Sequence, residues 1–239
     1  MQMDISFWSQ WNPDIKITHT QKKFYGKYLY KIVLHVPGGR LTQFKGNMKK
    51  LLADRLNYEK FYNPSLVGRI SDLENVKIEL LETIRAIRNN HSDSIHIRVE
   101  EPHIQIYGTD ILELEDLICN NLFSFSKDTV LSLTYPKDKI SEDALNAGAI
   151  IKKEPNGYKY KVILRDGMYG REIKQQLFNY FTSLGDEQVK ITAGMRRNLN
   201  SVNGYIWNIF YYTNDADINH FVSLIAPGII ANCHEMVIL

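Results

Sequence analysis

The chain has few cysteines, no CxxC pair and no long apolar run. Its 239 residues include two cysteines, Cys119 and Cys233, which is too few for a disulfide framework and argues against a thiolate zinc site. Both lie in or beside apolar stretches, so we expect reduced thiols in the core. No stretch approaches the roughly 20 apolar residues of a membrane span, and the N-terminus has no signal-peptide core. We therefore expect no membrane partner and a location in the host cytoplasm.

The chain also lacks a strong charge of either sign. Its net charge is +2, with 44% hydrophobic and 23% charged residues, which is ordinary for a globular protein. The length suits one large domain or two domains of about 100–120 residues each. A mildly basic balance neither requires nor excludes a polyanionic partner, so any such partner must be inferred from where the charges lie.

An internal repeat is present. Residues 28–35 (YLYKIVLH) align with residues 158–165 (YKYKVILR), with four of eight positions identical, and each is followed by a glycine-containing turn. Further on, residues 107–110 (YGTD) and 212–215 (YTND) each precede a helical pattern. Two matches in the same order indicate an internal duplication.

Hydrophobic periodicity gives each copy the same order of elements. The first copy is predicted as strand 28–36, helix 70–89 with Ser71 as N-cap, strands 94–99 and 103–107, helix 110–121 and strand 129–135. The second is predicted as strand 158–165, helix 169–183, strands 188–193 and 205–212, helix 215–225 and strand 229–238. The order β-α-β-β-α-β, found twice, predicts an α+β protein of two tandem ferredoxin-like units, each an antiparallel sheet with helices on one face.

The predicted boundaries follow from this pattern. Residues 1–25 form an aromatic N-terminal lead-in with Phe7, Trp8 and Trp11, and residues 26–136 form the first unit, with an insertion at about 41–66. Residues 137–155, where Lys, Asp, Gly and Pro collect, are predicted as a linker, and residues 156–239 as the second unit.

Strand alternation then predicts which side chains lie on the sheet faces that the helices leave open. In the first unit these are Lys31, His35, His96, Arg98, His103, Gln105 and Tyr107. In the second they are Lys159, Lys161, Arg165, Lys190, Asn208, Phe210 and Tyr212, with Arg196 and Arg197 in an adjoining basic hairpin loop, 195–203.

Phe210 and Tyr212 stand two residues apart on the predicted third strand, with lysines around them. This arrangement resembles that of RNA-recognition motifs, although the full RNP1 pattern is absent. The resemblance implies that the aromatic rings stack on bases while flanking Lys and Arg side chains contact phosphates.

The segment from Glu100 to Gln105 (EEPHIQ) carries a second, shorter similarity. It resembles the metal-binding motif of rolling-circle replication initiators, which implies that His103 and Gln105 hold a divalent ion for phosphodiester cleavage. That family also needs a tyrosine nucleophile on a helix, usually in a Tyr-x-x-Lys setting. Helix 110–121 has no tyrosine, and Tyr135 lies at a strand end with the wrong spacing.

Other catalytic signatures are missing, including GxxxxGK[ST], GxSxG and HExxH. We therefore expect a non-enzymatic protein without a cofactor that binds single-stranded nucleic acid or structured RNA. The alternative is a structural or assembly protein of a virus or mobile element. In that case the same sheet faces form a homo-oligomer or bind other subunits, and the virion is a second location. The third interpretation is a metal-dependent nuclease.

Overall fold

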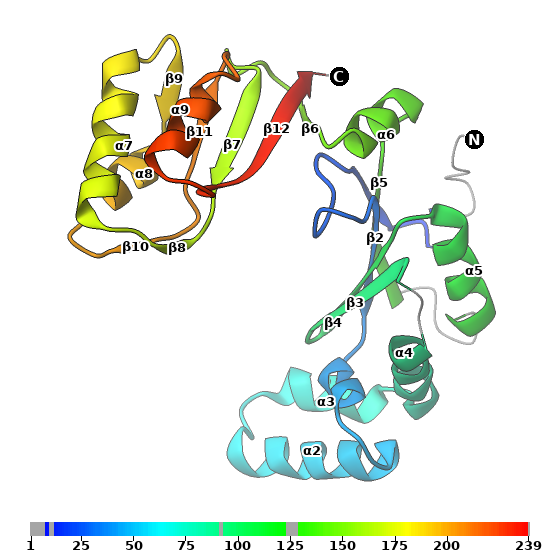
Figure 1. Ribbon diagram of the computed structural model, residues 1–239. Coiled ribbons are helices and arrows are strands. Elements are labelled where there is room, and N and C mark those ends of the chain that lie inside the picture. The colour runs from blue at the N-terminus through cyan, green and yellow to red at the C-terminus, as the bar shows by residue number, and fades with distance from the viewer. Residues whose placement is uncertain (1–7, 10–11, 91–92, 123–128, 239) are drawn as a thin grey trace. The chain divides into compact units, whose positions relative to one another are not determined.

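A computed structural model of the chain describes residues 8–9, 12–90, 93–122 and 129–238. The chain divides into two compact units, Met1–Glu142 and Asp143–Leu239. In Figure 1, unit 1 is coloured from blue to green and unit 2 from green to red. The fold class is α+β, because each unit combines helices with a five-stranded sheet, and unit 2 adds a two-stranded ribbon.

Unit 1 begins with two strands, and a run of helices separates its second strand from its third. Its elements are β1 (Lys16–His19), β2 (Tyr30–His35), the 3-10 helix η1 (Gly39–Gln43), α2 (Met48–Tyr62), α3 (Val67–Asn75), α4 (Ile78–Asn90), β3 (Ile95–Glu100), β4 (His103–Gly108), α5 (Ile111–Leu122) and β5 (Val130–Tyr135). The sheet order is β1-β5-β2-β4-β3. β1 runs parallel to β5, and the other neighbouring pairs are antiparallel.

The core of unit 1 lies on one face of this sheet. Along β2 buried and part-exposed residues alternate, with Ile32 and Leu34 fully buried. The α4 residues Leu81 and Ile84 are also fully buried. Gly108 of β4 is required for close packing, because a Cβ at that position would lie 2.6 Å from a side-chain carbon of Leu114 in α5.

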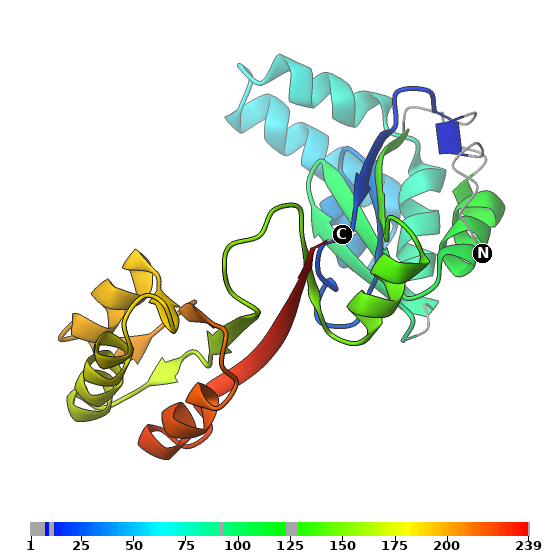
Figure 2. The same ribbon diagram turned by 90° about the horizontal axis from the view of Figure 1, so that it is seen from above.

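The helices α2 and α3 form an insertion that is held together by a buried carboxylate. Figures 1 and 2 show the two helices side by side. Glu59 is 1% exposed and lies 2.7 Å from Arg55 and 3.2 Å from Arg69, while Asn63 donates to it at 2.9 Å. Because Arg69 comes from α3, this cluster joins the two helices.

Unit 2 has the same strand order as unit 1. Its elements are β6 (Ile150–Lys152), β7 (Tyr160–Leu164), β8 (Gly167–Met168), α7 (Arg171–Leu184), β9 (Val189–Ile191), α8 (Ala193–Asn200), β10 (Tyr205–Ile206), β11 (Phe210–Thr213), α9 (Ile218–Ile225) and β12 (Ile230–Ile238), and α6 (Lys139–Asn146) precedes them across the unit boundary. The main sheet has the order β6-β12-β7-β11-β9, and β8 pairs with β10. β6 runs parallel to β12, as β1 does to β5.

The core of unit 2 is formed by α7, α8 and α9 on one face of the main sheet. Val162, Tyr211, Leu177 and Val222 are fully buried there. Lys174 of α7 is 1% exposed, and its ammonium donates to the carbonyl oxygens of Ser201 and Asn203. Burial lowers the pKa of Lys174. The buried lysine thereby anchors the loop between α8 and β10.

Two predicted connecting segments contain regular structure. Residues 16–19 of the expected lead-in form β1, and Trp8 is fully buried and donates to Glu115 at 3.1 Å, whereas Phe7 and Trp11 lie outside the described residues. The expected linker 137–155 contains α6 and β6. Periodicity misses β1 because none of its residues is fully buried, and β6 because it has only three residues.

The predicted helix 70–89 is two helices. α3 ends at Asn75, Val76 is extended, and α4 begins at Ile78, so Ser71 lies inside α3 and is not an N-cap. The apolar residues keep three- and four-residue spacing across the break, which hides it from periodicity. Cys233 is also exposed, not in the core as expected, and Cys119 is partly exposed.

Candidate nucleic-acid interface

The face of the unit 2 sheet opposite the helices carries two aromatic side chains of β11. Tyr211 is fully buried toward the helices, so its neighbours Phe210 and Tyr212 point to the other face, where both are partly exposed. Cross-strand register places Tyr212 opposite Lys161 of β7 and Lys190 of β9. The predicted juxtaposition of aromatic and basic residues is therefore present on this face.

Three rings form a row, which we call the aromatic row: Tyr158, Tyr212 and Phe210. The Tyr158 and Tyr212 centroids are 6.2 Å apart with an interplanar angle of 29°, and those of Tyr212 and Phe210 are 5.5 Å apart at 80°. The Lys161 ammonium lies 3.8 Å from the Phe210 centroid. A partly exposed ring beside a cation suits a base on a charged backbone.

Further cations lie at the ends of the same strands. Lys190 is exposed on β9, Lys159 is exposed just before β7, and Arg165 is exposed just after it. Lys159 lies 3.5 Å from Glu235, and its pKa is raised by a hydrogen bond to Tyr160 and by the Glu235 charge. Glu235 therefore neutralises part of the charge of Lys159.

The structure corrects the placement of three other predicted residues of unit 2. Arg196 and Arg197 lie on helix α8, not in a hairpin loop; Thr192 caps this helix by accepting from the Met195 amide at 3.1 Å. The predicted strand 205–212 is broken into β10 and β11, and Asn208 lies in the break with φ 50°. The buried pair Met195 and Leu199, four residues apart, was the signal for α8.

The corresponding face of unit 1 carries the predicted polar residues in register. His35 of β2 is opposite His103 of β4, with ring centroids 5.9 Å apart, and Lys31 is opposite Tyr107. On β3, His96 is opposite Tyr107 and Arg98 is opposite Gln105. The seven predicted residues of unit 1 therefore share one sheet face.

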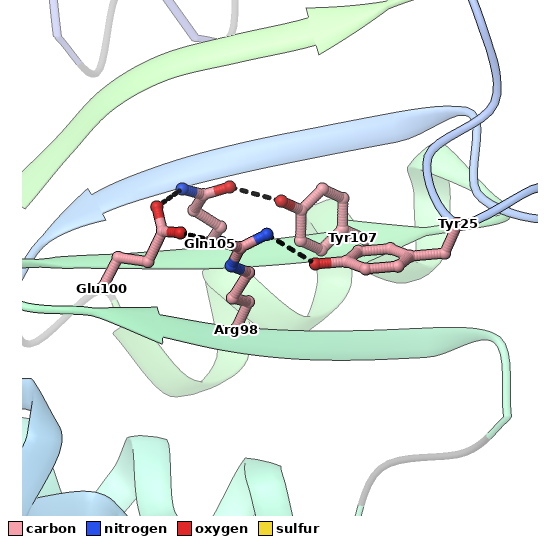
Figure 3. A network of polar contacts seen from close by, with 5 residues as sticks. All are labelled: Tyr25, Arg98, Glu100, Gln105 and Tyr107. Carbon is pink, nitrogen blue, oxygen red and sulfur yellow. Dashed lines mark hydrogen bonds and ion pairs between the residues drawn. The ribbon is translucent and has the colours of Figure 1, made fainter. Parts of the chain in front are cut away.

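Four polar side chains on this face are joined to one another by hydrogen bonds and an ion pair. Figure 3 shows Arg98 paired with Glu100, Gln105 donating to Glu100 at 2.6 Å, and Tyr107 donating to Gln105. Arg98 also donates to the Tyr25 hydroxyl at 3.3 Å, and this bond, followed by the Glu100 charge, raises the pKa of Arg98. Glu100 therefore offsets the charge of Arg98 on this face.

Strand alternation predicted that Tyr107 lies on an open surface, but a tyrosine-rich hairpin covers its side chain. Its exposed fraction is 4%, and the rings of Phe24 and Tyr25 lie 5.2 and 5.1 Å from its own. The hairpin is closed by the bridge between Phe24 and Tyr28, with Gly26 in the left-handed region at φ 71°. Burial raises the pKa of Tyr107 to about 12.

The two predicted metal ligands, His103 and Gln105, differ in their neighbours. His103 lies beside His35 of β2, with the ring centroids 5.9 Å apart. The Gln105 amide uses its nitrogen toward Glu100 and its oxygen toward Tyr107. Among the residues that the structure describes, no group of three His, Cys, Asp or Glu side chains is arranged to hold a metal ion.

Sequence reasoning missed two contributors to these faces. Tyr158, which stacks on Tyr212, belongs to the predicted strand 158–165, where alternation assigns it to the core face together with Val162. The observed strand β7 begins only at Tyr160, so alternation does not hold at Tyr158. Tyr25 approaches Tyr107 from a hairpin that does not belong to the sheet. The Tyr25-Gly26 pair is a turn signal, but no periodic pattern indicates which face a hairpin will cover.

No protein-family model, no curated protein and no solved structure matches this chain. Within the described residues, no helix is both long enough and apolar enough to cross a bilayer.

Proposed function

We propose that the chain is a non-enzymatic nucleic-acid-binding protein of two tandem ferredoxin-like units, and that the sheet face of unit 2 binds single-stranded nucleic acid. The observation that carries this proposal is the aromatic row, with Lys161 over Phe210 and Lys190 in register beside Tyr212. Bases stack on such rings, while neighbouring cations neutralise phosphates.

The ferredoxin-like assignment rests on chain order and strand order together. Counting from β2 in unit 1 and from β7 in unit 2, both sheets place the fourth strand beside the first, then the third and the second. In each unit a helix precedes the second strand and another precedes the fourth. This order agrees with that of the split βαβ fold and supports the assignment, with one further parallel edge strand in each unit.

Unit 1 is proposed as a secondary contact. Its face offers His35 and His103, both partly exposed, whereas Arg98 is paired with Glu100. Tyr107 is covered and unavailable for stacking. We therefore expect most of the affinity to come from unit 2.

The test is the affinity for a fluorescently labelled oligouridine, measured by anisotropy at low salt. Changing both Phe210→Ala and Tyr212→Ala should weaken binding by about tenfold or more, because each stacked base contributes roughly 1–3 kcal/mol. The matched control is Tyr205→Ala with Phe221→Ala, which removes two exposed aromatics from elsewhere in unit 2. An unchanged affinity in the first pair, or equal losses in both, rejects the proposal.

A second candidate function is self-assembly through the inserted helices of unit 1. Three exposed apolar side chains lie where α2 ends and α3 begins. Phe61 and Tyr62 end α2 and are 76% and 64% exposed, and Val67 begins α3 and is 69% exposed. Exposed apolar clusters of this kind mark protein contacts. Sedimentation velocity tests this candidate function. If the chain is an oligomer, and the double variant Phe61→Ser with Tyr62→Ser is a monomer, assembly is supported. A chain that is monomeric at all concentrations rejects assembly.

A further inference from the structure

Unit 1 contains a pocket whose charged lining is entirely basic. Its volume is about 470 Å³, and it lies between the segment at the end of η1, the second half of α4 and the edge strand β3. The segment contributes Phe44 and Lys45, and α4 contributes Arg85 and Arg88. All lining residues belong to the described part of the chain, and none of them carries a carboxylate.

The three cations of this pocket, Lys45, Arg85 and Arg88, have no carboxylate partner among the described residues. Arg85 and Arg88 are three residues apart on α4 and so lie on neighbouring positions of one helix face, where like charges are mutually destabilising. Within the part of the chain that the structure describes, neither arginine nor Lys45 forms an ion pair. A bound anion would relieve this repulsion.

Backbone carbonyls fix the two guanidinium groups without using all their donors. Arg85 donates to the Gly46 carbonyl at 2.7 Å, and Arg88 donates to the Thr42 carbonyl at 3.4 Å. The Arg85 Nε is buried and has no hydrogen-bond partner. Arg85 also donates to the Leu41 carbonyl and to the Met48 sulfur, both at 3.5 Å, so the donors that remain belong mainly to Arg88. Arg88 uses one of its five N–H donors in these bonds, and the others are available to an acceptor-rich ligand.

We propose that this pocket binds a nucleoside phosphate monoester, either a free nucleotide or the phosphorylated end of a strand. A monoester dianion gains more than a diester from three cations in one pocket. The volume lies within the range of small-molecule sites and exceeds what a phosphate alone needs. Phe44 lines the pocket and is 50% exposed, so its ring is available to stack on the base.

This pocket is independent of the aromatic row, because its residues belong to unit 1 and the row belongs to unit 2. The two proposals can therefore fail separately.

Isothermal titration of the full chain with adenosine 5′-monophosphate, adenosine and inorganic phosphate tests the site. The nucleotide should bind at least tenfold more tightly than adenosine, because charge-assisted hydrogen bonds to the phosphate are the strong ones. Lys45→Ala with Arg88→Gln should weaken nucleotide binding by about tenfold. Arg85 is left intact, since its bonds hold the Gly46 segment.

The matched control is Arg40→Gln with Lys49→Ala, two exposed cations of η1 and α2 that do not line the pocket. It should bind the nucleotide within about twofold of the unchanged chain, because it removes the same charge from elsewhere. Equal losses in both double variants, or no preference for the nucleotide over adenosine, overturns the proposal.

Oligouridines with and without a 5′-phosphate distinguish the two sources. If the chain prefers the phosphorylated strand, and Lys45→Ala with Arg88→Gln abolishes this preference, the site binds a strand end. Equal affinity for both strands, with nucleotide binding retained, assigns it to a free nucleotide. If neither the nucleotide nor the strand phosphate affects binding, the proposal is wrong.

Discussion

The ammonium group of Lys161 lies 3.8 Å from the ring centroid of Phe210, on the face of the unit 2 sheet that the helices leave uncovered. A cation over a ring face is attracted by the quadrupole of the ring, and it also neutralises a phosphate that approaches the same place. The charge and the stacking surface are thus built into one contact.

Lys161→Met should therefore reduce affinity for a labelled oligouridine several-fold and lower the slope of log affinity against log salt by about one, because one phosphate contact is lost. Lys161→Arg should keep both the affinity and the slope, since a guanidinium also stacks on a ring. Anisotropy titrations at several salt concentrations measure both quantities. A slope that stays the same in Lys161→Met would show that this cation meets no phosphate.

Gly108→Ala should destabilise unit 1, because the added Cβ would lie 2.6 Å from a side-chain carbon of Leu114. Overpacking of this kind costs about 1–3 kcal/mol. Urea unfolding followed by circular dichroism measures the loss. The control is Gly68→Ala in α3, where a Cβ meets nothing within 4 Å and a small gain is expected. Equal stability of the two variants would contradict the packing of α5 on β4.

Glu59→Gln should weaken the insertion, because it removes the negative charge that Arg55 and Arg69 share. We expect a loss of about 2 kcal/mol, less than for a fully buried pair, because both arginines are partly exposed. Glu74→Gln, which breaks the exposed pair with Lys60, is the control and should cost less than about 1 kcal/mol. Limited proteolysis between α2 and α3 gives a second readout, since only the first variant should expose that turn.

Two buried tyrosines predict the behaviour of unit 1 in alkali. Burial raises the pKa of both Tyr30 and Tyr107 from 10.0 to about 12. A raised pKa means that the folded state favours the neutral phenol, so this stability is complete below pH 10 and is lost as the pH rises toward 12. Phenolate absorbance against pH should show a late component that Tyr107→Phe reduces. A late component that Tyr107→Phe leaves unchanged would contradict the burial of this ring.

Alternation was the informative part of the sequence. It predicted that Phe210 and Tyr212 share a face with Lys161, because a strand with one buried face must alternate in burial. It failed where burial does not determine local structure. β1 has no fully buried residue to give it an alternating pattern. α8 is a short helix rich in Arg and Asn, so its sequence was interpreted as a turn despite the helical spacing of its two buried side chains. Alternation also gives no account of covering segments, so the hairpin over Tyr107 was unforeseen.

The most direct test of the unit 2 interface is photo-crosslinking of a 4-thiouridine oligonucleotide to the full chain, with the crosslinked peptides mapped by mass spectrometry. Bases that stack on the aromatic row should crosslink to Phe210, Tyr212 or Tyr158, and an excess of unmodified oligouridine should compete them away. Crosslinks confined to the helical face of unit 2, or to unit 1 alone, would contradict a binding surface on β7, β11 and β9.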